Sequence, residues 1–114
     1  MAKKDVDLTL SVKQTGAIKA TVFPFRRHLS KSGKDAARFN LNGDITYVEV
    51  SFTASNWPFK GSNKLLEGNT NFESPELDTA VAVGKVAKYS ITLYFDDFNG
   101  IERSVTIDPD MVID

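Results

Sequence analysis

Apolar and polar side chains alternate with a period of two along several stretches of this chain, and this pattern constrains the fold most. Val6, Leu8 and Leu10 are separated by single polar residues, and the same alternation runs through residues 89–95. A period of two places one set of side chains on one face of a β-strand. No long stretch shows the 3.6-residue apolar period of a helix. We therefore expect an all-β fold.

Short strands of this kind recur about seven to eight times, at intervals of roughly ten residues, which is typical of an antiparallel two-sheet sandwich. The length of 114 residues fits a single domain spanning residues 1–114, with no room for a second core. Ser74-Pro75-Glu76 resembles the cap and first turn of a one-turn helix. The less regular strands are expected at residues 39–41, 45–55, 63–67 and 78–83.

The register of the first hairpin follows from the requirement that the apolar faces of its two strands match. A two-residue turn at Thr15-Gly16 would set Val12 opposite Lys19 and mix the two faces. A three-residue loop over 14–16 instead sets Val12 opposite Ile18, and its last position favours a glycine in the left-handed region. We therefore predict the three-residue loop.

The same reasoning applies to the hairpin near the C-terminal end. A two-residue Asn99-Gly100 turn would pair Leu93 with Thr106, whereas a loop over 98–100 pairs Leu93 with Val105. The second register keeps the apolar side chains on one face, so we predict it. It also places two carboxylates, Asp96 and Glu102, directly opposite each other.

The segment between these hairpins resembles a known architecture. The residues from Val83-Gly84 through Tyr89 to Leu93 form a glycine turn followed by a tyrosine and a long alternating strand. They resemble the corner before the penultimate strand of fibronectin-III and related immunoglobulin-like domains. The resemblance covers about a dozen residues. The chain lacks the cysteine pair of the immunoglobulin pattern. It implies an immunoglobulin-like or fibronectin-III-like sandwich and no particular function.

The net charge of −1 hides a division of charge along the chain. Residues 1–38 carry nine basic and three acidic residues, or +6, whereas residues 39–114 carry five basic and twelve acidic residues, or −7. Two solvated faces of opposite charge would explain this division, and such fields can also steer association with a partner. Complementary charges would suit head-to-tail self-association as well.

A thirteen-residue basic segment, 26–38, shows little apolar periodicity. We expect it to form an exposed, mobile basic loop. Such a charge attracts acidic protein faces and phosphate-rich polymers, although the segment has no aromatic residue for stacking on bases. Nucleic acid is therefore the less favoured partner. The basic residues proposed to contact a partner are Arg26, Arg27, Lys31, Lys34 and Arg38.

Asn56-Trp57-Pro58-Phe59 places two large aromatic residues around a proline at the end of a strand. Trp57 and Phe59 would cover the open end of the sandwich as a lid, because such rings bury a large area. The alternative is that Trp57 and Phe59 form an exposed anchor for a partner.

Few residues suggest catalysis or metal binding. The only histidine, His28, lies beside two arginines, with neither a nucleophile nor an orienting carboxylate nearby in the sequence. The chain contains no cysteine, so it has no thiolate zinc site and no cysteine nucleophile. A weak calcium site at the second hairpin tip is the one metal candidate. Its ligands would be Asp96, Asp97, Asn99 and Glu102.

We therefore expect a non-catalytic β-sandwich that binds a protein partner, requires no cofactor and does not enter a membrane. Neither an apolar signal-peptide core nor a ~20-residue membrane span is present, which favours a cytoplasmic location. The first alternative is a self-assembling structural subunit of a virion, tail or secretion apparatus, which would use the basic and acidic surfaces. The second alternative is binding of nucleic acid or another polyanion through residues 26–38.

Overall fold

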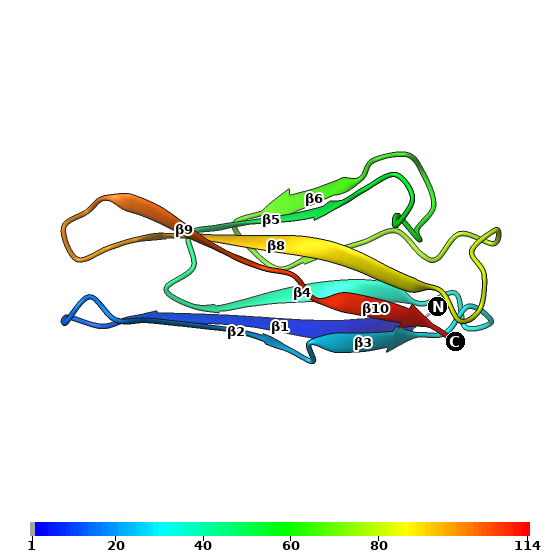
Figure 1. Cartoon of the computed structure of the whole chain (residues 1–114), viewed down its shortest axis with the longest axis horizontal. Helices are drawn as coiled ribbons and strands as arrows, with labels where there is room; N and C mark the ends of the chain where they lie inside the picture. The colour runs from blue at the N-terminus through cyan, green and yellow to red at the C-terminus, as the bar shows by residue number, and fades with distance from the viewer. Residues whose placement is uncertain (1) are drawn as a thin grey trace.

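A computed structural model describes residues 2–114 and shows ten strands in two sheets that pack face to face (Figure 1). The chain is therefore all-β, with more strands than the seven to eight expected. In chain order the strands are β1 (Lys3–Val12), β2 (Ile18–Phe23), β3 (Arg26–Leu29), β4 (Ala36–Gly43), β5 (Tyr47–Phe52), β6 (Leu65–Gly68), β7 (Phe72–Glu73), β8 (Val86–Asp96), β9 (Glu102–Ile107) and β10 (Asp110–Ile113).

The first sheet has the order β2-β1-β4-β7, and the second has the order β3-β10-β8-β5-β6, with β9 also paired to β8. Both sheets are mixed, which corrects the expectation of purely antiparallel sheets. β1 runs parallel to β4, and β3 runs parallel to β10. The cause is that the chain leaves the first sheet at Pro24 and enters the second as β3, beside the last strand of the chain.

Both predicted hairpin registers are confirmed. In the first hairpin Val12 pairs with Ile18 and Leu10 with Ala20. In the second, β8 and β9 pair Leu93 with Val105. The glycines that end the two loops have φ of 89° at Gly16 and 76° at Gly100, in the left-handed region that the loops require. Asp96 and Glu102 face each other as expected.

Alternation along the strands builds the core. In β8, alternate side chains from Ala87 to Phe95 are buried while their neighbours are exposed or half-buried. The β1 side chains Val6, Leu8 and Leu10 are fully buried in the opposite sheet. The core therefore lies between the two sheets, where apolar area is removed from water from both sides.

Two of the less regular predictions are wrong. No helix occurs within residues 2–114; the hydroxyl of Ser74 accepts a hydrogen bond from the Ala37 amide at 2.9 Å instead of capping a helix. Residues 78–83 form turns instead of a strand, because Asp78 Oδ1 accepts a bond from the Ala80 amide at 3.0 Å. The strands expected at residues 39–41, 45–55 and 63–67 are present as β4, β5 and β6.

The basic segment 26–38 is also not a single loop. Residues Arg26–Leu29 form β3, and β4 begins at Ala36, which leaves a loop of only six residues, 30–35. The buried Asp35 carboxylate holds this loop, because its Oδ2 accepts a bond from the Ser30 amide at 2.8 Å. The local sequence lacks an apolar alternation because β3 is a short strand at the margin of its sheet.

The molecule is elongated, with extents of 47 × 22 × 20 Å. The tips of the β1–β2 and β8–β9 hairpins lie together at one end, and both chain ends lie at the other (Figure 1). Within the part of the chain that the structure describes, no helix has the length and apolar character needed to cross a membrane.

Candidate functional site

A stretch of open backbone lies along β2 and β3. β2 is the last strand of the first sheet, and β3 is the last strand of the second. The two strands follow each other in the chain and contain six and four residues. On the opposite side the terminal strands β6 and β7 contain four and two residues, and β9, which pairs only with β8, leaves another open edge of six residues. An edge strand leaves a row of N–H and C=O groups without a partner in its sheet, so β2 and β3 form an open edge, here called the β2–β3 edge.

The corner of this edge carries two exposed aromatic side chains. Phe23 ends β2 with 72% of its surface exposed, and Phe25, on the other side of Pro24, is 53% exposed. The peptide bond between Phe23 and Pro24 is cis. Isolated exposed apolar residues are common on proteins, whereas large rings grouped at one place often mark a contact surface. This Phe23–Pro24–Phe25 group is here called the aromatic corner.

Arg26 is fixed beside the aromatic corner by an acid from the end of the chain. Its guanidinium donates Nε to Asp110 Oδ1 at 2.7 Å and Nη2 to Oδ2 at 2.9 Å. This two-point hydrogen bond raises the pKa of Arg26 and lowers the pKa of Asp110. Arg26 therefore contributes a fixed guanidinium whose charge is largely balanced within the fold.

The other proposed basic contacts are separated by the fold. Arg27 is half-buried on β3, and its Nε has no hydrogen-bond partner among the described atoms. Lys31 and Lys34 lie in the loop 30–35, and neither has a described carboxylate oxygen within 4 Å. Arg38 lies on β4, with Nε 3.3 Å from Glu73 Oε2. The structure therefore brings Arg26 and Arg27 to the β2–β3 edge. It places Arg38 on β4, which β1 separates from β2.

Ion pairs across the fold reduce the charge division seen in the sequence. Three pairs join a basic residue of 1–38 to an acid of 39–114. They are Lys3–Glu73, Arg26–Asp110 and Arg38–Glu73. The +6 and −7 segments are thus interleaved in space, so they do not form two separate charged halves. Charge on this molecule must be considered patch by patch.

His28 does have a carboxylate partner, which the local sequence did not reveal. Its Nδ1 lies 3.0 Å from Asp114 Oδ2, and both side chains are more than half exposed. The partner is the last residue of the chain and reaches His28 because β10 pairs with β3. A pair this open to water is typical of a surface ion pair.

Trp57 and Phe59 form the predicted lid. Phe59 is 1% exposed, and its ring centroid lies 5.2 Å from that of Trp57 and 5.8 Å from that of Phe52. The Trp57 indole Nε1 donates to the Gly61 carbonyl at 2.9 Å. A ring this deeply buried cannot anchor a partner, so Phe59 belongs to the core.

At the calcium candidate on the β8–β9 tip, both oxygens of the central carboxylate, Asp97, already accept hydrogen bonds from the hairpin. Asp97 Oδ1 accepts bonds from the Asn99 and Ile101 amides, both at 2.9 Å, and its Oδ2 accepts one from Arg103 Nε at 2.6 Å. The ion pair with Arg103, and then the amide bonds, lower the pKa of Asp97. No cluster of three or more possible metal-ligating side chains is found within residues 2–114.

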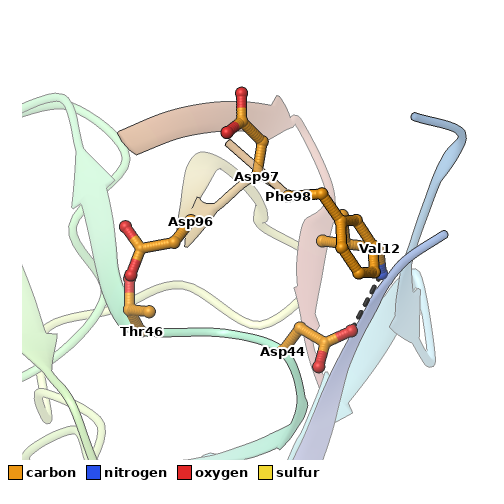
Figure 2. A pocket seen from close by; sticks show the side chains of 6 residues that line it. All are labelled: Val12, Asp44, Thr46, Asp96, Asp97 and Phe98. Atoms are coloured by element: carbon orange, nitrogen blue, oxygen red, sulfur yellow. Dashed lines mark hydrogen bonds between the residues drawn. The ribbon is translucent and has the colours of Figure 1, made fainter. Parts of the chain in front are cut away.

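A groove lies between the tips of the two hairpins (Figure 2). Phe98, which is 60% exposed, points across it toward Val12. Asp44 Oδ2 accepts a hydrogen bond from the Val12 amide at 2.8 Å and holds the β4–β5 loop against the end of β1. The part of the groove in Figure 2 has a volume of about 280 Å³ and is lined by Val12, Asp44, Thr46, Asp96, Asp97 and Phe98.

Sequence reasoning missed the aromatic corner and Phe98. The usable signal was Phe23-Pro24-Phe25 itself, since a proline within an alternating pattern indicates an edge strand, and an edge leaves its flanking rings exposed.

Comparison of the chain with protein-family models, with curated proteins and with solved structures finds no match in any of the three.

Proposed function

We propose that this chain is a non-catalytic protein-binding module whose recognition surface is the β2–β3 edge. The observation that carries the proposal is the coincidence of an open edge with the aromatic corner, where Phe23 is 72% and Phe25 is 53% exposed. An extended segment of a partner can add to such an edge as a further strand. Main-chain hydrogen bonds then give affinity, and side-chain contacts give specificity.

The charge of the edge favours an acidic partner segment. Residues 8–34 contain six basic residues and no acid. Asp110 balances Arg26, whereas Lys19, Arg27 and Lys31 form no ion pair with a described carboxylate. We therefore infer a partner segment in which acidic residues alternate with apolar ones, so that the apolar residues contact Phe23 and Phe25.

A polyanion is a weaker candidate for the same surface. Binding along a phosphate backbone needs several free cations on one face. Arg26 and Arg38 are already paired with carboxylates, and Arg38 lies on β4, which β1 separates from β2. The two aromatic side chains and the open backbone suit an extended peptide better.

We also propose that the sandwich is immunoglobulin-like or fibronectin-III-like in its general architecture. The long strand β8 follows a turn at Gly84, which has φ of 91°, and contains the buried Tyr89. These features support the likeness. The two parallel strand pairs depart from the antiparallel pairing of those domains.

A selection from a displayed random peptide library, made on the immobilised full chain, tests the proposed function. We expect enrichment of peptides in which Asp or Glu alternates with aromatic or β-branched residues. Bound peptide should slow hydrogen exchange of the amides in β2 and β3 and leave β6 unchanged. Enrichment that is equally strong on the F23S/F25S variant, or protection confined to another surface, would refute the proposal.

A matched control variant is Val83→Ser. Val83 is 67% exposed and lies outside the strands. It precedes Gly84, whose amide bonds to Ile113 at the end of β10, whereas Phe25 bonds to Asp110 at the start of β10, so its replacement removes an exposed apolar group away from the aromatic corner. We expect this variant to select the same peptides as the wild-type chain.

A further inference from the structure

The groove between the hairpin tips combines apolar and acidic chemistry. Its second part has a volume of about 360 Å³ and includes Ile18 and Arg103 together with Val12 and Phe98. Ile18 is 44% exposed and Phe98 60%, so an apolar surface is open to solvent on both walls. Asp44 and Asp96 lie on the rim of the first part, and Asp97 is held in place by Arg103.

The acidic groups of the groove are not balanced by the cations around it. Arg103 is the one basic residue among its lining residues, and Arg103 pairs with Asp97. Asp44 and Asp96 form no ion pair with a described cation. The groove therefore favours an apolar group that is accompanied by positive charge.

The aromatic corner of the same chain has this complementary chemistry. Phe23 and Phe25 are exposed, and Arg27, which forms no ion pair with a described carboxylate, follows them closely in the chain. The corner cannot reach the groove of its own molecule, because Ile18 and Phe23 are at opposite ends of β2, about 17 Å apart at ~3.3 Å per residue. Only another copy of the chain can bring these two surfaces together.

We propose that the groove between the β1–β2 and β8–β9 tips receives the aromatic corner of a second copy of this chain. The inference rests on the proposed function, because it identifies the partner of the β2–β3 edge as a further copy. The two surfaces in contact are different, so a pair of copies retains a free corner on one molecule and a free groove on the other. Contacts of this heterologous kind build rings or open filaments.

Light scattering after size-exclusion chromatography measures the association directly. We expect the average molar mass of the wild-type chain to rise as its concentration increases from ~10 µM to ~1 mM. The molar mass should fall again in ~0.5 M salt, because salt screens charge pairs at the rim. A mass equal to one chain at ~1 mM and low salt would overturn the inference.

A mixing experiment shows whether the two surfaces are the ones proposed. The F23S/F25S variant keeps an intact groove, and the F98S variant keeps an intact corner and an intact β2. We expect each variant alone to be a monomer and an equimolar mixture to form a dimer that grows no further. Self-association of either variant at the wild-type level, or a monomeric mixture beside an associating wild-type chain, would refute the pairing.

Two further readouts separate this inference from the function on which it rests. All three exchanged residues are exposed, so near-ultraviolet circular dichroism and thermal melting should match the wild-type chain. The F98S variant, whose change lies outside β2 and β3, should still bind a selected acidic peptide as tightly as wild type. Peptide binding by a chain that stays monomeric would leave the binding function standing and refute self-association.

Discussion

Arg26 on β3 and Asp110 on β10 form a two-point ion pair, with Nε–Oδ1 and Nη2–Oδ2 distances of 2.7 and 2.9 Å. Their strands run parallel, and the two residues are partners in the register. The pair joins the basic first third of the chain to its acidic C-terminal end. It also fixes β3 beside the aromatic corner, so the proposed binding edge depends on it.

Replacement of Asp110 by Asn should destabilise the fold in a pH-dependent manner. The bond to Arg26 lowers the pKa of Asp110 in the folded state. Its stabilisation is therefore fully present above the unfolded pKa of about 4 and is lost as the pH falls through the lower, folded pKa. In urea titrations we expect a lower free energy of unfolding for D110N at pH 7 than for wild type, and a difference that shrinks below about pH 4. A difference of equal size at all pH values would contradict the role of the ion pair, and the control D96N, which removes a carboxylate without a cation partner, should show no loss of stability at pH 7.

Replacement of Phe59 by Ala should be far more damaging than replacement of Phe23 by Ala. Phe59 is 1% exposed, whereas Phe23 is 72% exposed. Loss of a buried phenyl ring costs about 3–5 kcal/mol, and an exposed substitution usually changes stability by less than ~0.5 kcal/mol. Urea denaturation of both variants measures the two effects. Equal losses would show that the lid is not part of the core.

Replacement by alanine should destabilise the chain to different extents at Gly43 and Gly16, although the two glycines have similar φ angles. Gly43 and Gly16 have φ of 84° and 89°. A Cβ at Gly43 would lie 2.2 Å from the Leu10 carbonyl oxygen, whereas a Cβ at Gly16 would have no other atom within 4 Å. We expect about 1–2 kcal/mol of destabilisation for G16A, from the left-handed conformation alone, and a clearly larger loss for G43A. Thermal melting compares the two variants, and a milder effect at Gly43 would contradict the close parallel pairing of β1 with β4.

Replacement of Glu102 by Lys should stabilise the chain. Asp96 and Glu102 are cross-strand partners, and like charges in this position are destabilising, whereas opposite charges contribute roughly 0.2–1 kcal/mol. We expect a gain within this range at low salt, measured by chemical denaturation, and a smaller gain as salt screens the pair. A loss of stability at low salt would show that the two side chains do not interact.

The strands and both hairpin registers were predictable because they depend on local alternation and on matching faces, as in the pairing of Leu93 with Val105. The parallel pairs were not, because Arg26–Leu29 is too short to show a period and its partner is 84 residues away at Asp110. For Phe59 the sequence left two interpretations open, a lid over the end of the sandwich and an exposed anchor for a partner. The proline in Phe23-Pro24-Phe25 could indicate an edge strand with exposed rings, whereas the change of sheet at Pro24 is not encoded in the local pattern.

The affinity of a selected acidic peptide for the F23S/F25S variant, measured by titration calorimetry beside wild type and V83S, tests the binding edge most directly. If Phe23 and Phe25 anchor the partner, the double variant loses at least about 30-fold in affinity, the equivalent of ~2 kcal/mol, while V83S binds as wild type does. Equal affinity of all three chains would show that the aromatic corner is not the binding surface.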